Sequence, residues 1–235
     1  NAISMIFQEP MTALNPVQTI GNQVAETLII HGQAKRSEAL KVAREKLNRV
    51  GLTAKQFPLS KYPHELSGGQ RQRVAIALAI AMRPQILIAD EPTTALDVTT
   101  QSQILKLLKS LVDEEKMALI LITHDLAVVS GLANNVAVMQ NGEIVEAGKT
   151  KDVFHHMKHE YTRQLFSASN HVPTRNPKLA EVPLLEINNV IRNYKLPRES
   201  IFSRQKDFPA IRDISFTLKK GENLGLVGES GCGKS

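Results

Sequence analysis

The chain is poor in cysteine and in long hydrophobic runs. Cys232 is the one cysteine among the 235 residues, which excludes a disulfide framework or a cysteine-based metal cluster within this sequence. Such cysteine usage favours a reducing compartment such as the cytoplasm. The longest apolar runs, residues 74–82 and 118–122, fall short of the roughly 20 residues that a membrane-spanning helix needs. We therefore expect any contact with a membrane to be made through a partner protein.

The excess of positive charge is modest. The formal net charge is +6, and Lys and Arg are frequent between residues 192 and 220, yet acidic residues are interspersed among them. This mixture is typical of a solvated surface, so we expect no nucleic-acid partner. Hydrophobic residues make up 42% of the chain, which is enough for a globular core.

The first part of the chain has a mainly helical pattern, from about residue 12 to residue 83. Gly51 is a plausible stop for one of these helices. Apolar residues precede it near helical spacing, namely Leu40, Ala43, Leu47 and Val50. This pattern predicts a helical subdomain.

An α/β unit follows the helical region. Two short apolar runs, residues 86–89 and 118–123, are typical of buried parallel strands. Between them lies an apolar stripe at helical spacing, made of Ile104, Leu107, Leu108 and Leu111. The order strand, helix, strand predicts a crossover connection within a parallel sheet.

The third part combines a hairpin, a helix and a linker. Asn141 and Gly142 stand between two apolar stretches and predict a hairpin turn, and a helix is expected from Lys151 to about Ser167. Three prolines then occur within residues 171–183. We interpret this stretch as a linker, because neither a helix nor a central strand accommodates such a series.

Strand patterns return from residue 184, and the chain ends on a motif that is typical of phosphate-binding loops. Residues 224–227 form an apolar run, and the next eight fit G-x-x-x-x-G-K-S. They are Gly228, Glu229, Ser230, Gly231, Cys232, Gly233, Lys234 and Ser235. Glycines let backbone N–H groups surround phosphate oxygens, Lys234 would reach the β- and γ-phosphates, and the Ser235 hydroxyl would bind Mg²⁺. The alternative is a glycine turn with a surface lysine.

A capped helix start is predicted at Leu66-Ser67-Gly68-Gly69-Gln70. Ser67 and Gln70 satisfy the S-x-x-Q capping box, so a structural role suffices to explain them. The same geometry presents free N–H groups and the positive end of a helix dipole, which also suit an anion.

Polar residues at the ends of the two apolar strands are candidates for chemistry. Asp90 and Glu91 end one run, and His124 follows the other. Ligands of α/β sheets bind at the carboxyl ends of strands, and a second carboxylate beside the first can orient water for in-line attack. A polar strand exit, and a loop histidine with no further role, are the alternatives.

Taken together, these motifs resemble those of ATP-binding-cassette proteins, and they occur in that family's order. The Leu66–Gln70 segment resembles the family signature, and the resemblance covers essentially the whole chain. It implies an α/β fold of the P-loop NTPase type, with a RecA-like parallel sheet, a helical subdomain and a small antiparallel edge. The implied cofactors are ATP and Mg²⁺, and the implied activity is transport-coupled ATP hydrolysis.

The resemblance also implies roles for single residues. Gln8 would contact Mg²⁺ and the attacking water, Asp90 would hold Mg²⁺, and Glu91 would polarise the water. His124 would contact the γ-phosphate, and Asp97 would belong to the D-loop. Tyr194 would stack on adenine, although a half-buried strand tyrosine is nearly as good an interpretation.

Two further segments, residues 8–16 and 159–165, resemble peptide importers of bacteria. By this resemblance the partners would be transmembrane permease subunits and a substrate-binding protein, at the cytoplasmic face of the inner membrane. A soluble tandem cassette acting on ribosomes or nucleic acid is a competing function. A nucleotide-binding module without turnover is a third, against which the adjacent carboxylates Asp90 and Glu91 argue.

The order of the motifs predicts parts of two cassettes in one chain. Residues 1–170 would be the C-terminal part of a first cassette, residues 171–183 a linker, and residues 184–235 the start of a second. The sequence begins with Asn1 and stops at Ser235 within a motif. We therefore expect an internal segment of a longer tandem protein, without ATPase activity by itself.

Overall fold

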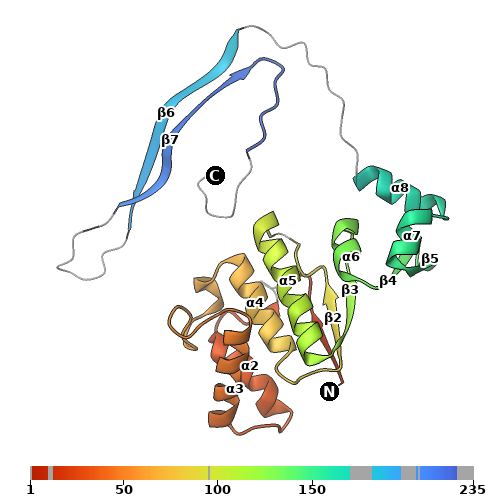
Figure 1. Ribbon diagram of the computed structural model, residues 1–235. Coiled ribbons are helices and arrows are strands. Elements are labelled where there is room, and N and C mark those ends of the chain that lie inside the picture. Colours follow the sequence, from red (N-terminus) through yellow and green to blue (C-terminus); the bar gives the residue numbers. More distant parts are fainter. Residues whose placement is uncertain are drawn as a thin grey trace. The chain divides into compact units, whose positions relative to one another are not determined.

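The fold comprises two units, Asn1–His171 and Val172–Ser235. The structure is a computed structural model that describes residues 2–9, 13–94, 96–169, 182–196, 205 and 207–226. Figure 1 shows the helices and strands of both units along the chain.

Helices dominate the first part of the first unit. They are α2 (Ile20–Ile30), α3 (Arg36–Arg49), the short 3₁₀ helix η1 (Pro63–Glu65) and α4 (Gly68–Ala79). The Thr19 side chain caps α2 by accepting a hydrogen bond from the Asn22 N–H. Gly51, with φ of 85°, follows the end of α3, which confirms the predicted stop.

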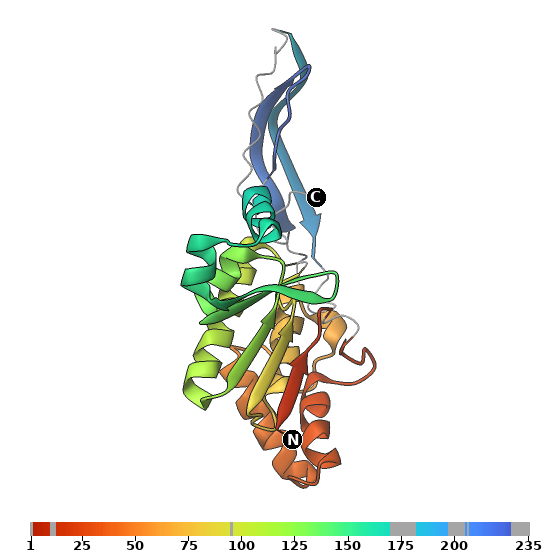
Figure 2. The ribbon, with the colours of Figure 1, turned by 90° about the vertical axis from the view of Figure 1, so that its right-hand side faces the viewer.

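A three-stranded parallel sheet lies beside these helices. Its strands are β1 (Ile3–Ile6), β2 (Ile86–Asp90) and β3 (Ala118–Ile122), in that order. Figure 2 shows the three strands side by side. The predicted crossover is confirmed, because α5 (Val98–Glu115) connects β2 to β3 and buries Ile104, Leu108 and Leu111.

One expectation about β3 is wrong. A continuous apolar run predicts burial on both faces, yet Ile120 and Ile122 are 50% and 47% exposed. Leu119 and Leu121, which alternate with them, pack against the core. Side chains of a strand alternate between two faces, so the helices cover one face of β3 and leave the other to solvent.

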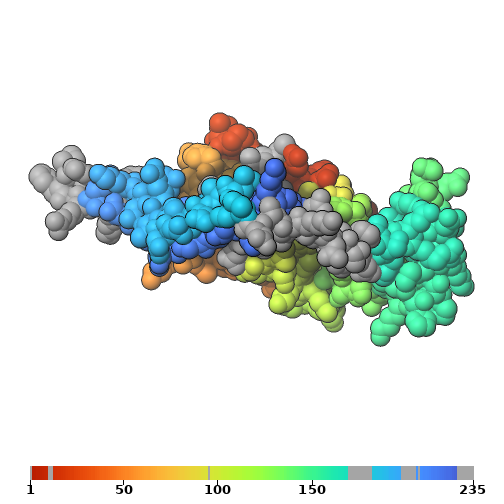
Figure 3. All heavy atoms as spheres, turned by 90° about the horizontal axis from the view of Figure 1, so that it is seen from above, coloured from red at the N-terminus to blue at the C-terminus, as the bar shows by residue number. Residues whose placement is uncertain are grey.

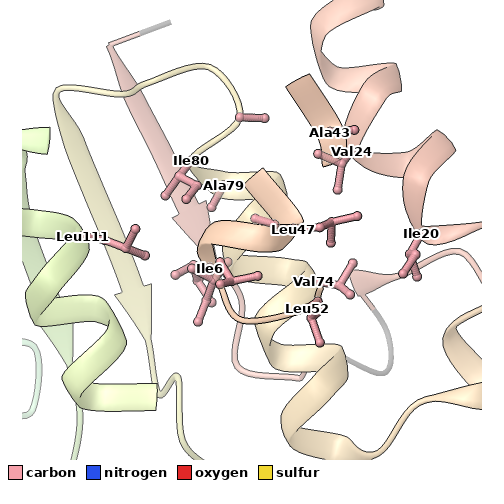
Figure 4. Packing of buried hydrophobic residues seen from close by; sticks show 14 of the residues in the cluster. Ile6, Ile20, Val24, Ala43, Leu47, Leu52, Val74, Ala79, Ile80 and Leu111 are labelled. Carbon is pink, nitrogen blue, oxygen red and sulfur yellow. The ribbon is translucent and has the colours of Figure 1, made fainter. Parts of the chain in front are cut away.

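A single cluster of buried side chains joins the helices to the sheet. It contains Leu47 of α3, Val74 of α4, Ile6 of β1 and Leu111 of α5, each at most 1% exposed. Figure 4 shows these side chains directed toward one another. Burial of one such side chain contributes about 1.5–3 kcal/mol, so the cluster stabilises the helical part and the sheet together.

The first unit ends with a hairpin and three short helices. These elements are α6 (Leu126–Leu132), β4 (Asn135–Gln140), β5 (Glu143–Lys149), α7 (Thr150–His156) and α8 (Glu160–Ser169). Asn141 and Gly142 have φ of 52° and 86°, so the predicted two-residue turn is confirmed.

The prediction of a single helix from Lys151 to Ser167 is wrong. The first helix of this segment, α7, ends just before Met157, whose φ of 41° is in the left-handed region, and α8 begins three residues later. Figure 3 shows the side chains of α7 and α8, blue-green in this view, gathered together.

The described part of the second unit is an antiparallel pair, β6 (Pro183–Lys195) and β7 (Asp207–Lys219). Pro183, assigned to the linker from the sequence, opens β6, where an edge strand tolerates a proline. The strand expected from residue 224 is not formed over residues 224–226. A strand needs a hydrogen-bonded neighbour, and β6 and β7 pair with each other.

None of the helices in the described ranges combines the length and the hydrophobicity that a membrane span requires.

Candidate active site

Three of the predicted site residues follow the carboxyl ends of three neighbouring parallel strands. Gln8 lies two residues beyond β1, Glu91 directly follows β2, and His124 lies two residues beyond β3. Parallel strands end at the same edge of a sheet, which is where α/β proteins bind ligands. Sheet topology thus brings together side chains that are far apart in the sequence.

Glu91 is the centre of this group. The Gln8 amide donates a hydrogen bond to Glu91 Oε2 at 3.0 Å, and His124 Nδ1 lies 3.1 Å from Glu91 Oε1. The Thr94 hydroxyl donates to Oε2 at 2.7 Å. Both carboxylate oxygens are therefore held, which fixes the orientation of the Glu91 side chain.

The backbone of Glu91 is in the left-handed region, with φ of 41°. This conformation costs a non-glycine residue about 1–2 kcal/mol. The Glu91 N–H donates to the Ile122 carbonyl at 2.9 Å, and the next residue, Pro92, is buried. These contacts hold the left-handed turn, which directs the chain away from β2 immediately after Asp90.

The surroundings of Glu91 favour its charged form. The hydrogen bond from Thr94 and then that from His124 lower the pKa of the Glu91 carboxyl below its ordinary value, against the opposing effect of burial. The Glu91 side chain is 23% exposed and that of His124 is 79% exposed. A deprotonated, partly open carboxylate can accept a hydrogen bond from a water molecule.

Thr94 was missed by the sequence interpretation. Its position could have indicated a contact, because Thr94 lies three residues after Glu91 at a strand exit that contains Pro92. Turns commonly join residues i and i+3. Two adjacent threonines occur there, however, and spacing alone did not indicate that Thr94 contacts the carboxylate.

Asp90 is the last residue of β2 and pairs in register with Ile122 of β3. Its carboxylate therefore lies at the same sheet edge as Glu91. Carboxylate oxygens, like side-chain amide oxygens, are suitable ligands for Mg²⁺. Within the described ranges no three acidic, histidine or cysteine side chains converge as a metal site, so Mg²⁺ would need further ligands such as water and phosphate.

The predicted capping box at the start of α4 is confirmed. The Ser67 N–H donates to Gln70 Oε1 at 2.9 Å, and the Gln70 N–H donates to Ser67 Oγ at 3.4 Å. Ser67 is the N-cap, and Gly68 and Gly69 are the first residues of the helix. The reciprocal bonds account for Ser67 and Gln70 structurally, and an anion at this helix start is compatible with them.

The start of α5 lies against the start of α4. A Cβ atom at Gly69 would lie 2.4 Å from Thr100 Cγ2, so a larger residue here would require the Thr100 side chain to move. Asp97 caps α5, because its carboxylate accepts hydrogen bonds from the Thr100 N–H and hydroxyl, each at 2.9 Å. The structure thus places Asp97 near the α4 start, as part of a second group of predicted residues.

Tyr194 lies on β6 and is 55% exposed. It pairs in register with Phe208 of β7, and the Arg192 guanidinium lies 5.1 Å from the centre of its ring. The predicted phosphate-binding residues, Gly228 to Ser235, lie outside the described residues.

A parallel sheet with Asp90 and Glu91 at a strand exit, flanked by a helical subdomain, defines the ATPase domain class of the P-loop NTPase fold. The chain belongs to the ABC transporter family, whose model matches residues 1–94 and 211–235. The predicted family and fold are therefore confirmed.

Relatives and solved structures agree with this assignment. The chain is 45% identical over 260 aligned residues to the glutathione import ATP-binding protein GsiA of Salmonella choleraesuis, and 44% identical to GsiA of Escherichia coli K12. Each alignment covers 99% of this chain but 42% of the relative, so the chain spans less than half the length of these proteins.

Two solved structures share the fold. The ATP-binding cassette MJ0796, in a dimeric post-hydrolysis state bound to ADP and Pi, has a TM-score of 0.56 and 35% identity, and the match covers 64% of this chain and 63% of that one. CbiO1 of Clostridium perfringens, part of the ABC transporter complex cbiONQ, has a TM-score of 0.58 and 30% identity, with 71% and 67% covered.

Proposed function

We propose that this chain supplies ATP-hydrolysing machinery to an ABC importer. The observation that carries the proposal is the convergence of Gln8 and His124 on the Glu91 carboxylate. Three polar groups at neighbouring strand ends form a site that can orient one water molecule in front of a phosphate.

In the proposed reaction a water oxygen attacks the γ-phosphorus of ATP. The bond from the γ-phosphorus to the oxygen that bridges it to ADP breaks, and phosphate leaves with the oxygen of the water. Glu91 accepts a hydrogen bond from the water and orients its lone pair, Gln8 holds the carboxylate and the water, and His124 contacts the γ-phosphate. A proton of the water passes to the carboxylate or to a phosphate oxygen.

Other residues would hold the nucleotide and its metal. Asp90 and Gln8 would hold the Mg²⁺ of the nucleotide at Glu91, whereas Gly228 to Ser235 would surround the phosphates of a second nucleotide, whose Mg²⁺ Ser235 would hold. Mg²⁺ supplies positive charge that offsets the charge of the phosphate oxygens. Ser67 to Gln70 and Asp97 would face the phosphates of a bound nucleotide, and Tyr194 would stack on an adenine.

The proposed organisation is that of a tandem protein. Residues 1–170 would belong to one cassette, residues 171–183 to a linker, and residues 184–235 to a second cassette. Two separate family matches, and relatives more than twice as long as this chain, support this division.

The proposed cargo is a small peptide. Support for this cargo comes from relatives whose name assigns them to glutathione import, while cbiO1, as part of a transporter complex, supports only the expectation of partner subunits. The partners would be permease subunits and a substrate-binding protein, with the ATPase at the cytoplasmic face of a bacterial inner membrane. No observation favours the ribosomal or nucleic-acid alternative.

The test is Glu91→Gln in the full-length protein that carries this sequence. We expect hydrolysis at this site to fall at least about a hundredfold, because a positioned base contributes roughly 10²–10⁴-fold, while the Kd for ATP stays within about threefold. Single-turnover hydrolysis and equilibrium ATP binding measure the two quantities.

Lys234→Ala is the contrasting variant. It should weaken nucleotide binding at the other site through loss of a charge-assisted phosphate contact. Wild-type single-turnover hydrolysis by Glu91→Gln would contradict the proposed function.

A further inference from the structure

Thr94 is bonded to Glu91 through both its backbone and its side chain. The Thr94 N–H donates to the Glu91 carbonyl oxygen at 3.2 Å, which closes a turn over residues 91–94. The Thr94 hydroxyl donates to Glu91 Oε2 at 2.7 Å, the shortest of the three contacts with this carboxylate. The position of the Thr94 hydroxyl relative to Glu91 is therefore set by the turn of residues 91–94.

The other two partners of Glu91 come from distant segments. Gln8 is 83 residues away and His124 is 33 residues away, and each follows a different strand. Under the proposed function, both also contact the water or the phosphate, so they are not dedicated to Glu91. Of the three partners, Thr94 is the one that contacts only the Glu91 carboxylate and neither the water nor the phosphate.

The distribution of donors decides which carboxylate oxygen is open to water. Oε2 accepts from both Thr94 and Gln8, whereas Oε1 has one partner among the described residues, His124. A carboxylate has about four lone-pair positions, two on each oxygen. The two donors occupy both lone-pair positions of Oε2, and one lone-pair position of Oε1 stays available to a water molecule.

From this geometry we infer that Thr94 is a positioning residue for ATP hydrolysis. Its hydroxyl holds Glu91 Oε2, so that Oε1 faces the reacting water. The inference rests on the proposed function of Glu91. It requires the hydroxyl group at position 94 and not the methyl group.

The test compares Thr94→Val, which removes the hydroxyl at nearly constant volume, with Thr94→Ser, which keeps it. In the full-length ATPase we expect Thr94→Val to lower kcat about tenfold with KM within about twofold, because the interaction acts on the water-activation step. Thr94→Ser should stay within about threefold of the wild type. Thr93→Val is the matched control, since Thr93 is not among the three residues that hold Glu91, and it should leave kcat unchanged.

Two kinetic results would overturn the inference. One is a wild-type kcat in Thr94→Val, and the other is an equal loss in Thr94→Ser or Thr93→Val, which would indicate local damage to the turn. Glu91→Gln in the same series tests the proposed function separately, since full activity of that variant refutes the role of Glu91 and not the contact with Thr94.

A second measurement needs no turnover. Gln8 and Thr94 donate to the same oxygen, so in the ¹⁵N-labelled full chain Thr94→Val should shift the side-chain amide resonances of Gln8, whereas Thr94→Ser and Thr93→Val should not. Unchanged Gln8 resonances in Thr94→Val would overturn the positioning role whatever the activity.

Discussion

Glu146 of β5 shows how one carboxylate determines where a helix ends. It accepts hydrogen bonds from the Lys158 N–H at 3.0 Å, the His159 N–H at 3.1 Å and the Thr162 hydroxyl at 2.6 Å. These donors lie just after α7 and in the first turn of α8. A carboxylate at that point satisfies N–H groups that a continuous helix would bond internally. The break at Met157 therefore depends on a residue of another element.

The same contacts make stability depend on pH. The hydrogen bond from Thr162, followed by those from the backbone N–H groups, lowers the pKa of the Glu146 carboxyl in the folded state. Its stabilising contribution is therefore present above the pKa of the unfolded state, about 4.3, and is lost as the pH falls through the lower folded-state pKa. We expect Glu146→Gln to be less stable than the wild type at pH 7, with the difference shrinking below about pH 4.

Urea unfolding at pH values from 3 to 7 measures this difference. Glu143→Gln removes an exposed carboxylate at the start of the same strand and serves as the control. A difference between the wild type and Glu146→Gln that stays constant over this range would contradict the prediction.

At the scale of elements, two helices start side by side, and each start has its own cap. Ser67 caps α4 and Asp97 caps α5, while Gly69 allows Thr100 of α5 to approach α4. Residues that a functional motif singles out thus also stabilise the helices that carry them. A loss of activity on replacing Asp97 would combine both effects, which a stability measurement can separate.

Asp97→Ala should destabilise the chain by about 1 kcal/mol, since it removes the acceptor of two hydrogen bonds at the α5 start. Asp97→Asn should stay within about 0.5 kcal/mol of the wild type, because asparagine caps helices about as well as aspartate. The measurement is the free energy of unfolding in urea. Asp113→Ala, at an exposed position near the other end of α5, is the control and should not destabilise. Equal losses for Ala and Asn at position 97 would contradict a capping role.

At the scale of the whole first unit, one core connects the helical part to the sheet. Leu47 of α3 is 0% exposed and belongs to the same cluster as Ile6 of β1 and Leu87 of β2. The strand ends that carry Gln8 and Glu91 are thus supported by packing with helices that precede β2 in the chain. Cooperative unfolding of both parts is the physical consequence.

Leu47→Ala should destabilise the first unit by about 2–5 kcal/mol, whereas Leu47→Met, which nearly conserves volume, should cost less than about 1.5 kcal/mol. Hydrogen exchange measures the effect residue by residue. Because the core is shared, the amides of β2 should lose protection in Leu47→Ala as those of α3 do. Unchanged protection of β2 would mean that the helices and the sheet open independently.

Local features of the chain were predictable because they depend on neighbouring residues. The capping box of Ser67 and Gln70, the turn at Asn141 and Gly142 and the stop at Gly51 each use contacts within a few positions. The order β2, α5, β3 followed from the period of apolar residues, since burial of one helix face requires that spacing. The sequence by itself thus determined these caps and turns and the order β2, α5, β3, together with the motifs that place the chain in its family.

Tertiary structure alone decided how the candidate site is assembled. The contact of Gln8 and His124 with Glu91 depends on the sheet order β1-β2-β3, which brings Glu91 together with residues that lie 83 and 33 positions away in the chain. The exposed face of β3 and the break at Met157 depend likewise on what other elements cover or bond. The physical reason is the same in each case: a short-range pattern specifies the conformation of a segment, whereas hydrogen bonds and burial between distant segments exist only once the chain has packed.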